Sequence, residues 1–264
     1  MESNLPLLSV VIPFYNEQAC VCDVCTEVNA VLSPGLSGRW ELIMVNDGST
    51  DRTGELMNAM AARFSHFRAI HLHPNSGQSA AMDAGFRAAR GEVIGTMDGD
   101  GQNDPRDFPI LLQAMADQRV NMMCGIRQKR SDSSIRKISS RIANRIRAAV
   151  LNDGISDVGC SLRVFRRTCL ERICFFKNAH RFFPALVQMA GCSVSELPVR
   201  HRPRMAGESR YGGGIRSRLF AGLIDLLGVY WVKKRFLRYA VTEHQNTALS
   251  LCSHPISKDK ACSA

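Results

Sequence analysis

The 264-residue sequence lacks an apolar run of the roughly 18 residues that a helix needs to cross a bilayer. Its longest candidate, residues 219–232, is shorter and contains Asp225. The first four residues include Glu2 but no basic residue, and residues 5–14 are typical of a strand, so we expect no signal peptide. These absences predict a cytoplasmic protein, or one bound peripherally to the cytoplasmic face of a membrane.

Aromatic residues are also scarce, at 7% of the sequence, and no nucleic-acid-binding module is recognisable. Because aromatic stacking is a main way of holding nucleic-acid strands, we expect no nucleic-acid partner. The ten cysteines are too sparse for a disulfide scaffold and are typical of reduced thiols. A zinc site could use Cys20, Cys22, Cys25, His71 and His73, but no second Cys-x-x-Cys pair supports one.

Positive charge, in contrast, is abundant. Lysine and arginine number 34 against 24 acidic residues, which gives a formal net charge of +10. This excess indicates an anionic partner, such as a phosphorylated substrate or an anionic membrane surface. The sequence has no Gly-x-x-x-x-Gly-Lys motif and no Gly-x-Gly-x-x-Gly after a strand. A bound diphosphate would therefore need a metal ion and arginine or lysine to neutralise it.

Strand and helix patterns alternate along the first half of the chain. Strands are predicted at residues 8–14, 40–45, 67–72, 92–97 and 121–126, and later at 193–199. Helices are predicted at residues 21–32, 51–64, 79–89, 105–118 and 134–151. This alternation predicts an α/β fold with a mostly parallel, buried sheet, and ligands bind such sheets beyond the carboxyl ends of the strands.

The sharpest motif follows the predicted strand 92–97 and reads Asp-Gly-Asp-Gly-Gln-Asn-Asp-Pro from Asp98 to Pro105. Carboxylates at Asp98 and Asp100 can converge on one divalent cation, and their hard oxygen atoms suit Mg²⁺ or Mn²⁺. An EF-hand is excluded, because Asn103 stands where that loop needs glycine and Pro109 where it needs glutamate. A polar turn with a helix-capping aspartate remains the alternative.

A second acidic motif, Asn-Asp-Gly-Ser-Thr-Asp, runs from Asn46 to Asp51 between a predicted strand and a helix. An aspartate here can accept hydrogen bonds from a base or ribose, as acidic residues do in other α/β nucleotide-binding folds. A plain turn and helix cap would account for Gly48, Ser49 and Asp51, but not for Asp47.

These motifs, with Val-Val-Ile-Pro-Phe-Tyr-Asn-Glu at residues 10–17, resemble the ordered motifs of family 2 glycosyltransferases. The Asp-x-Asp-x-Gln form followed by Asp-Pro is similar to the polyprenol-phosphate branch, which includes dolichol-phosphate mannose synthase. Later segments resemble that branch as well: Gly-Ile-Arg at 125–127, RKISSRIAN at 136–144 and RMAGESRY at 204–211. The resemblance covers roughly residues 7–240 and implies a GT-A fold.

The resemblance also implies roles for individual residues in using a nucleotide-diphosphate sugar. Asp98, Asp100 and Gln102 would hold the metal and the donor diphosphate. The remaining implied sites are a nucleoside site of Pro13, Tyr15, Glu17 and Asp47, an acceptor-phosphate site of Arg127, Arg136 and Ser140, and a donor-closing loop with Arg204, Ser209 and Arg210. Arg210 stands where the family usually has lysine, which keeps the charge but changes the geometry.

The expected reaction is an inverting transfer, and the charge of the acceptor decides whether it needs a general base. Metal and arginines stabilise the leaving diphosphate. A polyprenyl phosphate acceptor is already ionised and requires no general base, whereas a hydroxyl acceptor does. The candidate base is Asp157, in the loop 154–159, although a plain turn aspartate explains it equally well. A hydroxyl-acceptor transferase and a non-catalytic nucleotide-sugar-binding module remain alternatives.

The C-terminal part predicts one more helix, over residues 215–238. Its apolar centre is flanked by basic residues, which include Lys233, Lys234 and Arg235, and Tyr230 and Trp231 lie near one end. These features are typical of an interfacial helix on anionic lipid, with a core or oligomer helix as the alternative. We expect a glycosyltransferase domain at 1–214, a basic amphipathic helix at 215–240 and a disordered tail at 241–264.

Overall fold

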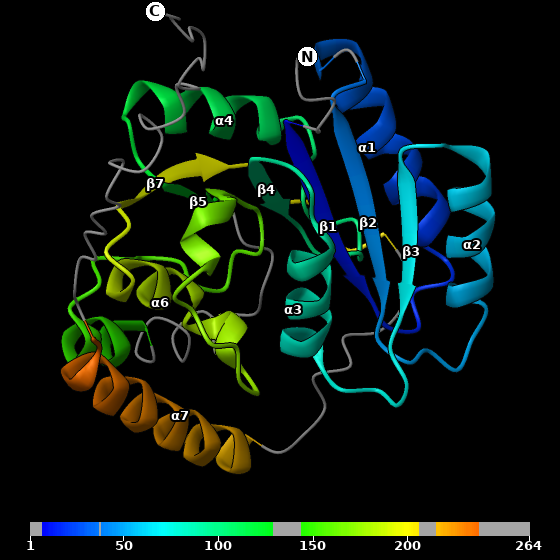
Figure 1. The fold of residues 1–264 in the computed structure, drawn as a ribbon. Helices are drawn as coiled ribbons and strands as arrows, with labels where there is room; N and C mark the ends of the chain where they lie inside the picture. Colours follow the sequence, from blue (N-terminus) through cyan, green and yellow to red (C-terminus); the bar gives the residue numbers. More distant parts are fainter. Residues whose placement is uncertain (1–6, 37, 129–143, 206–214, 238–264) are drawn as a thin grey trace, which may run out of the picture.

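The computed structural model describes residues 7–36, 38–128, 144–205 and 215–237. In this part of the chain, a seven-stranded sheet runs through the middle of the molecule (Figure 1). The strand order is β3-β2-β1-β4-β6-β5-β7. The strands are β1 (Leu8–Phe14), β2 (Trp40–Asn46), β3 (Phe67–His71), β4 (Val93–Thr96), β5 (Met122–Arg127), β6 (Arg163–Arg166) and β7 (Val194–Val199).

The sheet is mostly parallel, as the sequence predicts. Strand β1 pairs in parallel with both β2 and β4, β2 with β3, and β5 with β7. Strand β6 is the exception, since it lies antiparallel between β4 and β5. Strand β6 was not predicted, because its four residues begin and end with arginine and show no strand-like alternation. The buried Arg163 is accommodated by donating to the carbonyl of Val158 at 2.6 Å.

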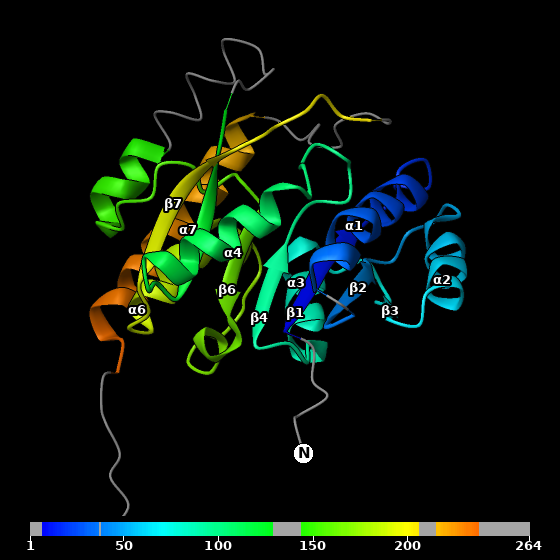
Figure 2. The same cartoon turned by 90° about the horizontal axis from the view of Figure 1, so that it is seen from above.

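Helices cover both faces of the sheet (Figure 2). Successive strand residues point to opposite faces, so Val10 and Ile12 pack against one helical layer while Val11 packs against the other. The first layer contains α1 (Val21–Leu36), α2 (Thr53–Arg63) and α4 (Asp107–Asp117); the second contains α3 (Gln78–Ala88) and α6 (Phe183–Met189). In the described residues between β6 and α6, the chain forms two 3₁₀ turns, η1 (Arg167–Leu170) and η2 (Ala179–Arg181).

Helix α7 (Ile215–Arg235) lies outside this sandwich, against α6 and the helical residues 144–151. Its buried Leu226 and Val229 share a third apolar cluster with Leu151 and Leu186. No helix in the described part of the chain is both long and apolar enough to span a membrane.

Helix α1 ends four residues later than predicted. Helix α1 was expected to stop before Ser33-Pro34-Gly35 but continues through Pro34 to Leu36, because a proline near the last turn removes only one backbone donor. The helix predicted at 134–151 is seen at residues 144–151, and residues 129–143 lie outside the described part. The described cysteines are free thiols, and the expected C-terminal tail is also outside that part.

Candidate functional site

The carboxyl ends of β1, β2 and β4 meet at one edge of the sheet, because these strands are parallel neighbours. The loops after them carry the predicted acidic residues. Strand β6 runs the opposite way, so the segment that enters it, including Asp157, comes to the same edge. The candidate site is therefore assembled from loops that are far apart in the sequence.

Asp47 follows β2, and its buried carboxylate is tied to the loop between β3 and α3. It accepts hydrogen bonds from the side-chain amide of Asn75 at 3.0 Å and from the backbone N–H groups of Ser76 and Gly77 at 2.8 and 2.9 Å. Gly48 allows the close approach, since a Cβ there would lie 2.5 Å from the backbone nitrogen of Asn75. These bonds give Asp47 a role in holding two loops together. A residue of a plain turn would not have this role.

The loop after β1 is joined to the loop after β2. The side chain of Asn16 accepts from the backbone N–H of Thr50 at 2.6 Å, and the N–H of Glu17 donates to Thr53 Oγ1 at 2.8 Å. Tyr15 is exposed beside them, and Pro13 lies opposite Val45 in the sheet register. Of the four residues predicted to line a nucleoside site, Tyr15, Glu17 and Asp47 thus lie on two connected loops, and Pro13 lies in β1 just before the first of them.

The carboxylates of Asp98 and Asp100 have different partners. Asp98 Oδ1 accepts from Gln78 Nε2 at 2.8 Å, whereas Asp100 accepts from the N–H of Gln102 at 3.0 Å and from Arg204 Nη2 at 3.1 Å. Burial, together with the negative charge of Asp100, raises the pKa of Asp98 to about 6. Two carboxylates that disfavour each other's charge form a donor set that a divalent cation would stabilise.

Arg204 links the acidic loop to the loop after β1. Its guanidinium lies 3.1 Å from Asp100 Oδ2 and 3.3 Å from Glu17 Oε1. The segment that carries it is held by Arg202, which pairs with Asp104 at 2.7 Å and with Glu27 at 2.8 Å. Despite burial, hydrogen bonds from Arg106 and Arg202 keep the pKa of Asp104 well below its usual value. The pairing of Arg202 with Asp104 and Glu27 could not be predicted, because these residues lie far apart in the sequence.

Arg127, at the end of β5, makes a two-pronged ion pair with Asp157. Its Nε and Nη2 atoms donate to the two carboxylate oxygens at 2.9 and 2.8 Å, and both side chains are largely buried. Glu196 holds the Asp157 loop by accepting from the N–H groups of Ser156 and Asp157. Sequence reasoning selected Arg127 and Asp157 for separate roles and did not foresee this contact.

For the other predicted site residues, the structure gives few contacts or none. Arg136, Ser140, Ser209 and Arg210 lie outside the described residues. The side-chain amide of Gln102 faces the carbonyl of Arg202, at 3.4 Å. Within the described ranges no group of three or more His, Cys, Asp or Glu residues is arranged to hold a metal. Asp98 and Asp100 would have to share a cation with substrate oxygens and water, as Mg²⁺ sites commonly do.

Comparison with known proteins finds one matching family, Glycosyl transferase family 2, over residues 9–174. Among similar proteins, the dodecaprenyl-phosphate galacturonate synthase of Rhizobium johnstonii is 37% identical over 238 residues, 88% of this chain and 68% of that protein. The undecaprenyl-phosphate 4-deoxy-4-formamido-L-arabinose transferase of Edwardsiella ictaluri is 35% identical over 210 residues, 79% of this chain and 64% of that protein. The chain thus spans about two thirds of the length of these relatives.

Solved structures share the fold at lower identity. The glucosyl-3-phosphoglycerate synthase of Mycobacterium tuberculosis, crystallised with Mn²⁺ and UDP, has a TM-score of 0.62 at 17% identity and matches 84% of this chain and 80% of that one. A mannosyltransferase of Pyrobaculum calidifontis, crystallised with GDP-mannose and Mn²⁺, has a TM-score of 0.61 at 20% identity and matches 90% and 66%. The expected GT-A architecture is therefore confirmed.

Proposed function

The chain belongs to glycosyltransferase family 2, and from this membership we propose that it transfers a sugar from a nucleotide-diphosphate sugar to a polyprenyl phosphate. The observation that carries the proposal is the meeting of Asp98, Asp100 and Arg204 at the carboxyl edge of the sheet. The two relatives described above, which are named for polyprenyl-phosphate products, support the acceptor class. Their names differ in the sugar, so galacturonate, formamido-arabinose and the mannose suggested by the sequence motifs are all candidates.

The donor site divides into two halves in this proposal. We assign the nucleoside contacts to Pro13, Tyr15, Glu17 and Asp47, and the contacts with the metal and diphosphate to Asp98, Asp100 and Gln102. A bound Mg²⁺ or Mn²⁺ would neutralise the departing diphosphate. Arg204 adds a fixed positive charge from this chain on the same side, which stabilises the negative charge of the leaving group.

The acceptor site is proposed around Arg127, with Arg136 and Ser140 beyond the described residues. The contact between Arg127 and Asp157 bears on the choice of acceptor, because both oxygens of Asp157 already accept hydrogen bonds from the guanidinium. A carboxylate bound in this way is a poor general base. This supports an acceptor that is already ionised, such as lipid phosphate, over a hydroxyl acceptor.

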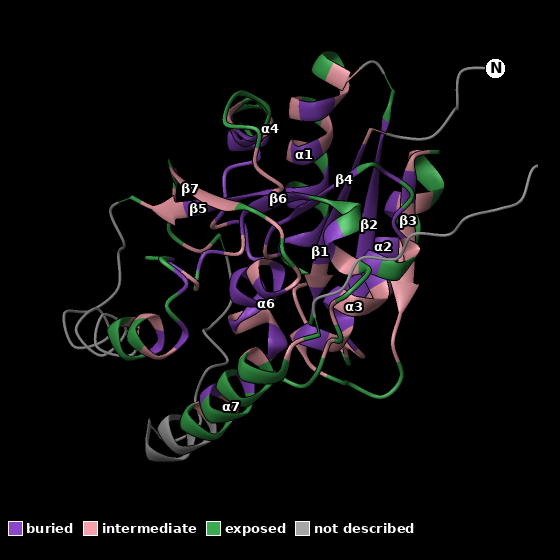
Figure 3. Cartoon of the chain, turned by 60° about the vertical axis from the view of Figure 1, so that its left-hand side comes forward, coloured by how far each residue is buried: buried purple, intermediate pink, exposed green. Residues whose placement is uncertain are grey.

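A lipid acceptor requires a membrane, and we propose that α7 meets it. Within the described side chains, 222–235, helix α7 is apolar on two opposite faces rather than amphipathic. Leu226 and Val229 pack inward, while four large apolar residues are each roughly half exposed or more: Leu223, Ile224, Leu227 and Trp231. Figure 3 shows that much of the described part of α7 has the colour of exposed residues. An exposed apolar patch with cations at one end fits an anionic lipid surface.

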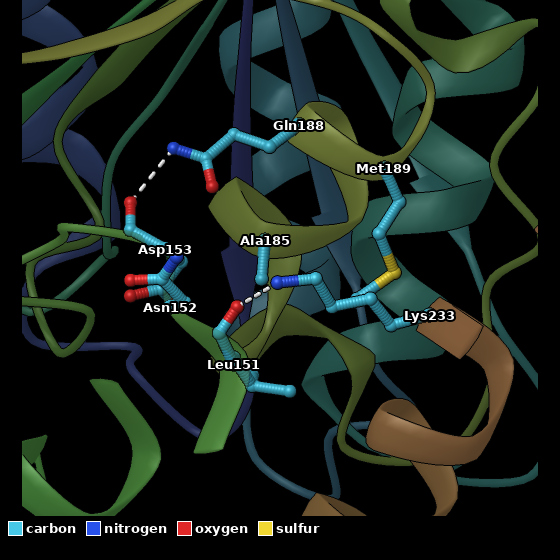
Figure 4. Close-up of a pocket in the computed structure, with 7 residues that line it drawn as sticks. All are labelled: Leu151, Asn152, Asp153, Ala185, Gln188, Met189 and Lys233. Atoms are coloured by element: carbon cyan, nitrogen blue, oxygen red, sulfur yellow. Dashed lines mark hydrogen bonds between the residues drawn. The ribbon is translucent and has the colours of Figure 1, made fainter. Parts of the chain in front are cut away.

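The three basic residues at the end of α7 do not all point the same way. Lys233 points inward and donates to the carbonyl of Leu151, the last residue of the helical segment 144–151 (Figure 4). Lys234 Nζ instead lies 5.5 Å from the centre of the Tyr230 ring. Arg235 Cζ lies 4.8 Å from the centre of the Trp231 ring. The acidic Asp225 is held by Asn178 at 3.0 Å. The proposed lipid-facing surface therefore comprises Leu223, Ile224, Leu227, Trp231, Lys234 and Arg235, at the cytoplasmic side of a membrane.

Incubation of purified protein with a panel of nucleotide sugars tests the proposed reaction. Each donor is offered with Mn²⁺, with and without undecaprenyl phosphate, and lipid-linked sugar is measured. We expect transfer from one donor that depends on the lipid phosphate. Transfer only to a glycan or glycolipid hydroxyl would support the alternative acceptor, and binding without turnover of any donor would support a nucleotide-sugar-binding module.

A further inference from the structure

Five consecutive residues, 75–79, connect three loops at the edge of the candidate site. Asn75, Ser76 and Gly77 hold the carboxylate of Asp47, as described above. The next residue, Gln78, opens α3 and donates to Asp98, and Ser79 bonds to His180 on η2. The segment thus joins the half of the site assigned to the nucleoside to the half assigned to the diphosphate.

Gln78 is held on both sides before its side chain reaches Asp98. Gly77 adopts a φ of 90°, which favours glycine, and its N–H is bonded to Asp47. Ser79 is buried, with its hydroxyl 2.7 Å from His180 Nδ1 and accepting from the His180 backbone N–H at 3.1 Å. With its backbone anchored in this way, Gln78 loses little freedom when its amide aligns with the carboxylate.

The two carboxylates of the acidic loop are oriented by chemically different donors. Asp100 is held by the cationic Arg204, which partly neutralises its charge. Asp98 is held by the neutral amide of Gln78 at 2.8 Å, which fixes the direction of the carboxylate but leaves its negative charge in place. A carboxylate that must attract a cation needs that combination of fixed geometry and retained charge.

We propose that Gln78 is a positioning residue of the donor site, which orients Asp98 toward the divalent cation of the donor diphosphate without neutralising it. The inference rests on the proposed function, because it requires Asp98 to be a metal ligand. It assigns a role to a residue that neither acidic motif contains. Gln78 acts through Asp98, so its effect is expected on metal and donor affinity rather than on acceptor use.

The test measures Mn²⁺ binding by electron paramagnetic resonance in the presence of UDP or GDP, which requires no turnover. Gln78→Ala should weaken Mn²⁺ binding by about ten- to a hundred-fold, the range for a hydrogen bond to a charged group. Gln78→Lys should also weaken it, because the ammonium would keep the contact with Asp98 but cancel its charge. Alanine is a good helix former, so the first turn of α3 should persist.

A matched control is available in Gln113, whose Nε2 also donates to an aspartate oxygen at 2.8 Å, that of Asp117 on the exposed side of α4. Gln113→Ala should leave Mn²⁺ affinity unchanged. Parent-like Mn²⁺ affinity in Gln78→Ala, or full affinity in Gln78→Lys, would overturn the positioning role. Asp98→Ala distinguishes this failure from that of the proposed function. Parent-like Mn²⁺ binding in Asp98→Ala would show that Asp98 is not a metal ligand, which contradicts the proposed donor site itself.

Discussion

At the scale of single residues, Asp98 and Arg127 are each oriented by one side chain from a distant part of the sequence, Gln78 for Asp98 and Asp157 for Arg127. Asp47, Asp98 and Asp100 could be predicted because polar residues that follow parallel strands share one edge of the sheet. The bond from Gln78 to Asp98 and the pairing of Arg127 with Asp157 could not. Each joins a loop to the end of a helix or strand that only the folded chain brings near it.

The roles of Asp98 and Asp100 lead to the first prediction. Asp98→Ala or Asp100→Ala should abolish detectable sugar transfer, a loss of at least about a hundred-fold, because the leaving diphosphate loses its counter-charge. Chelation of divalent cations should do the same to the parent protein. Transfer is measured as lipid-linked sugar formed per minute with saturating donor. Full activity in excess chelator would rule out the metal role.

The ion pair between Arg127 and Asp157 gives a second prediction. Arg127→Ala should lower kcat/KM for lipid phosphate by tens- to hundreds-fold, as expected for a charge-assisted contact of about 1.5–3 kcal/mol. Asp157→Asn should have a similar effect, because Arg127 is then no longer oriented. The double variant should lose little more than either single variant, which indicates coupling.

The control for this pair is the exposed bond between Arg87 and Asp83 on α3, whose removal should not change kcat/KM. Additive losses in the double variant would show that Arg127 and Asp157 act separately. An equal effect of Arg127→Ala on donor affinity would place Arg127 in the donor site instead.

At the scale of elements, segments with a clear apolar pattern are predicted well even when they are as short as β4, and segments without one are missed. Strand β1 has the predicted ends, and β2, α3 and β7 differ from prediction by a residue at an end. Strand β6 was missed because arginine stands at both of its ends, and α6 because its seven residues span only about two helical turns. Their placement depends on packing, since Phe165 and Phe183 meet edge to face with ring centroids 4.9 Å apart.

Helix α3 and η2 are joined by Ser79 and His180, and this junction predicts a pH dependence of stability. Burial, followed by the charges of Arg181 and Arg163, lowers the pKa of His180 to about 3. An unfolded histidine has a pKa near 6.5, so below that pH the unfolded state takes up a proton that the folded state refuses. Stability should therefore be complete above about pH 6.5 and fall toward pH 3.

From pH 7 to pH 5, the protonation of His180 in the unfolded state alone should lower the free energy of unfolding by about 2 kcal/mol. Urea denaturation at the two pH values measures the loss, and His180→Asn should show a loss smaller by about that amount. An identical difference between the two pH values in parent and variant would mean that His180 is protonated in the folded protein.

At the scale of the whole molecule, the sequence predicts a helix rich in apolar and basic residues after the sheet, but not its orientation. Only packing shows that Lys233 faces the segment 144–151 while Lys234 and Arg235 lie with the outward apolar side chains. Three adjacent basic residues that look equivalent in the sequence therefore divide into one that contacts the rest of the fold and two that lie over aromatic rings of α7 itself.

This division predicts how variants should bind vesicles. The parent protein should sediment with vesicles containing phosphatidylglycerol more than with neutral ones, and 1 M salt, which shortens screening to about 3 Å, should weaken the difference. Lys234→Ala with Arg235→Ala should weaken binding by about thirty-fold, at about 1 kcal/mol for each basic residue. Leu227→Gln with Trp231→Ala should remove the binding that survives salt, because burial of apolar side chains in lipid does not depend on charge.

Lys233→Ala is the matched control, since it removes the same charge from the adjacent position. It should lower the thermal midpoint, because the carbonyl of Leu151 loses its donor, yet leave most of the vesicle binding intact. Equal weakening by all three basic substitutions would show that net charge, rather than the outward surface, attracts the protein. Absence of vesicle binding together with a dimer that dissociates on Leu227→Gln would assign the surface to a second copy of the chain. The lipid acceptor would then have to reach Arg127 by another route.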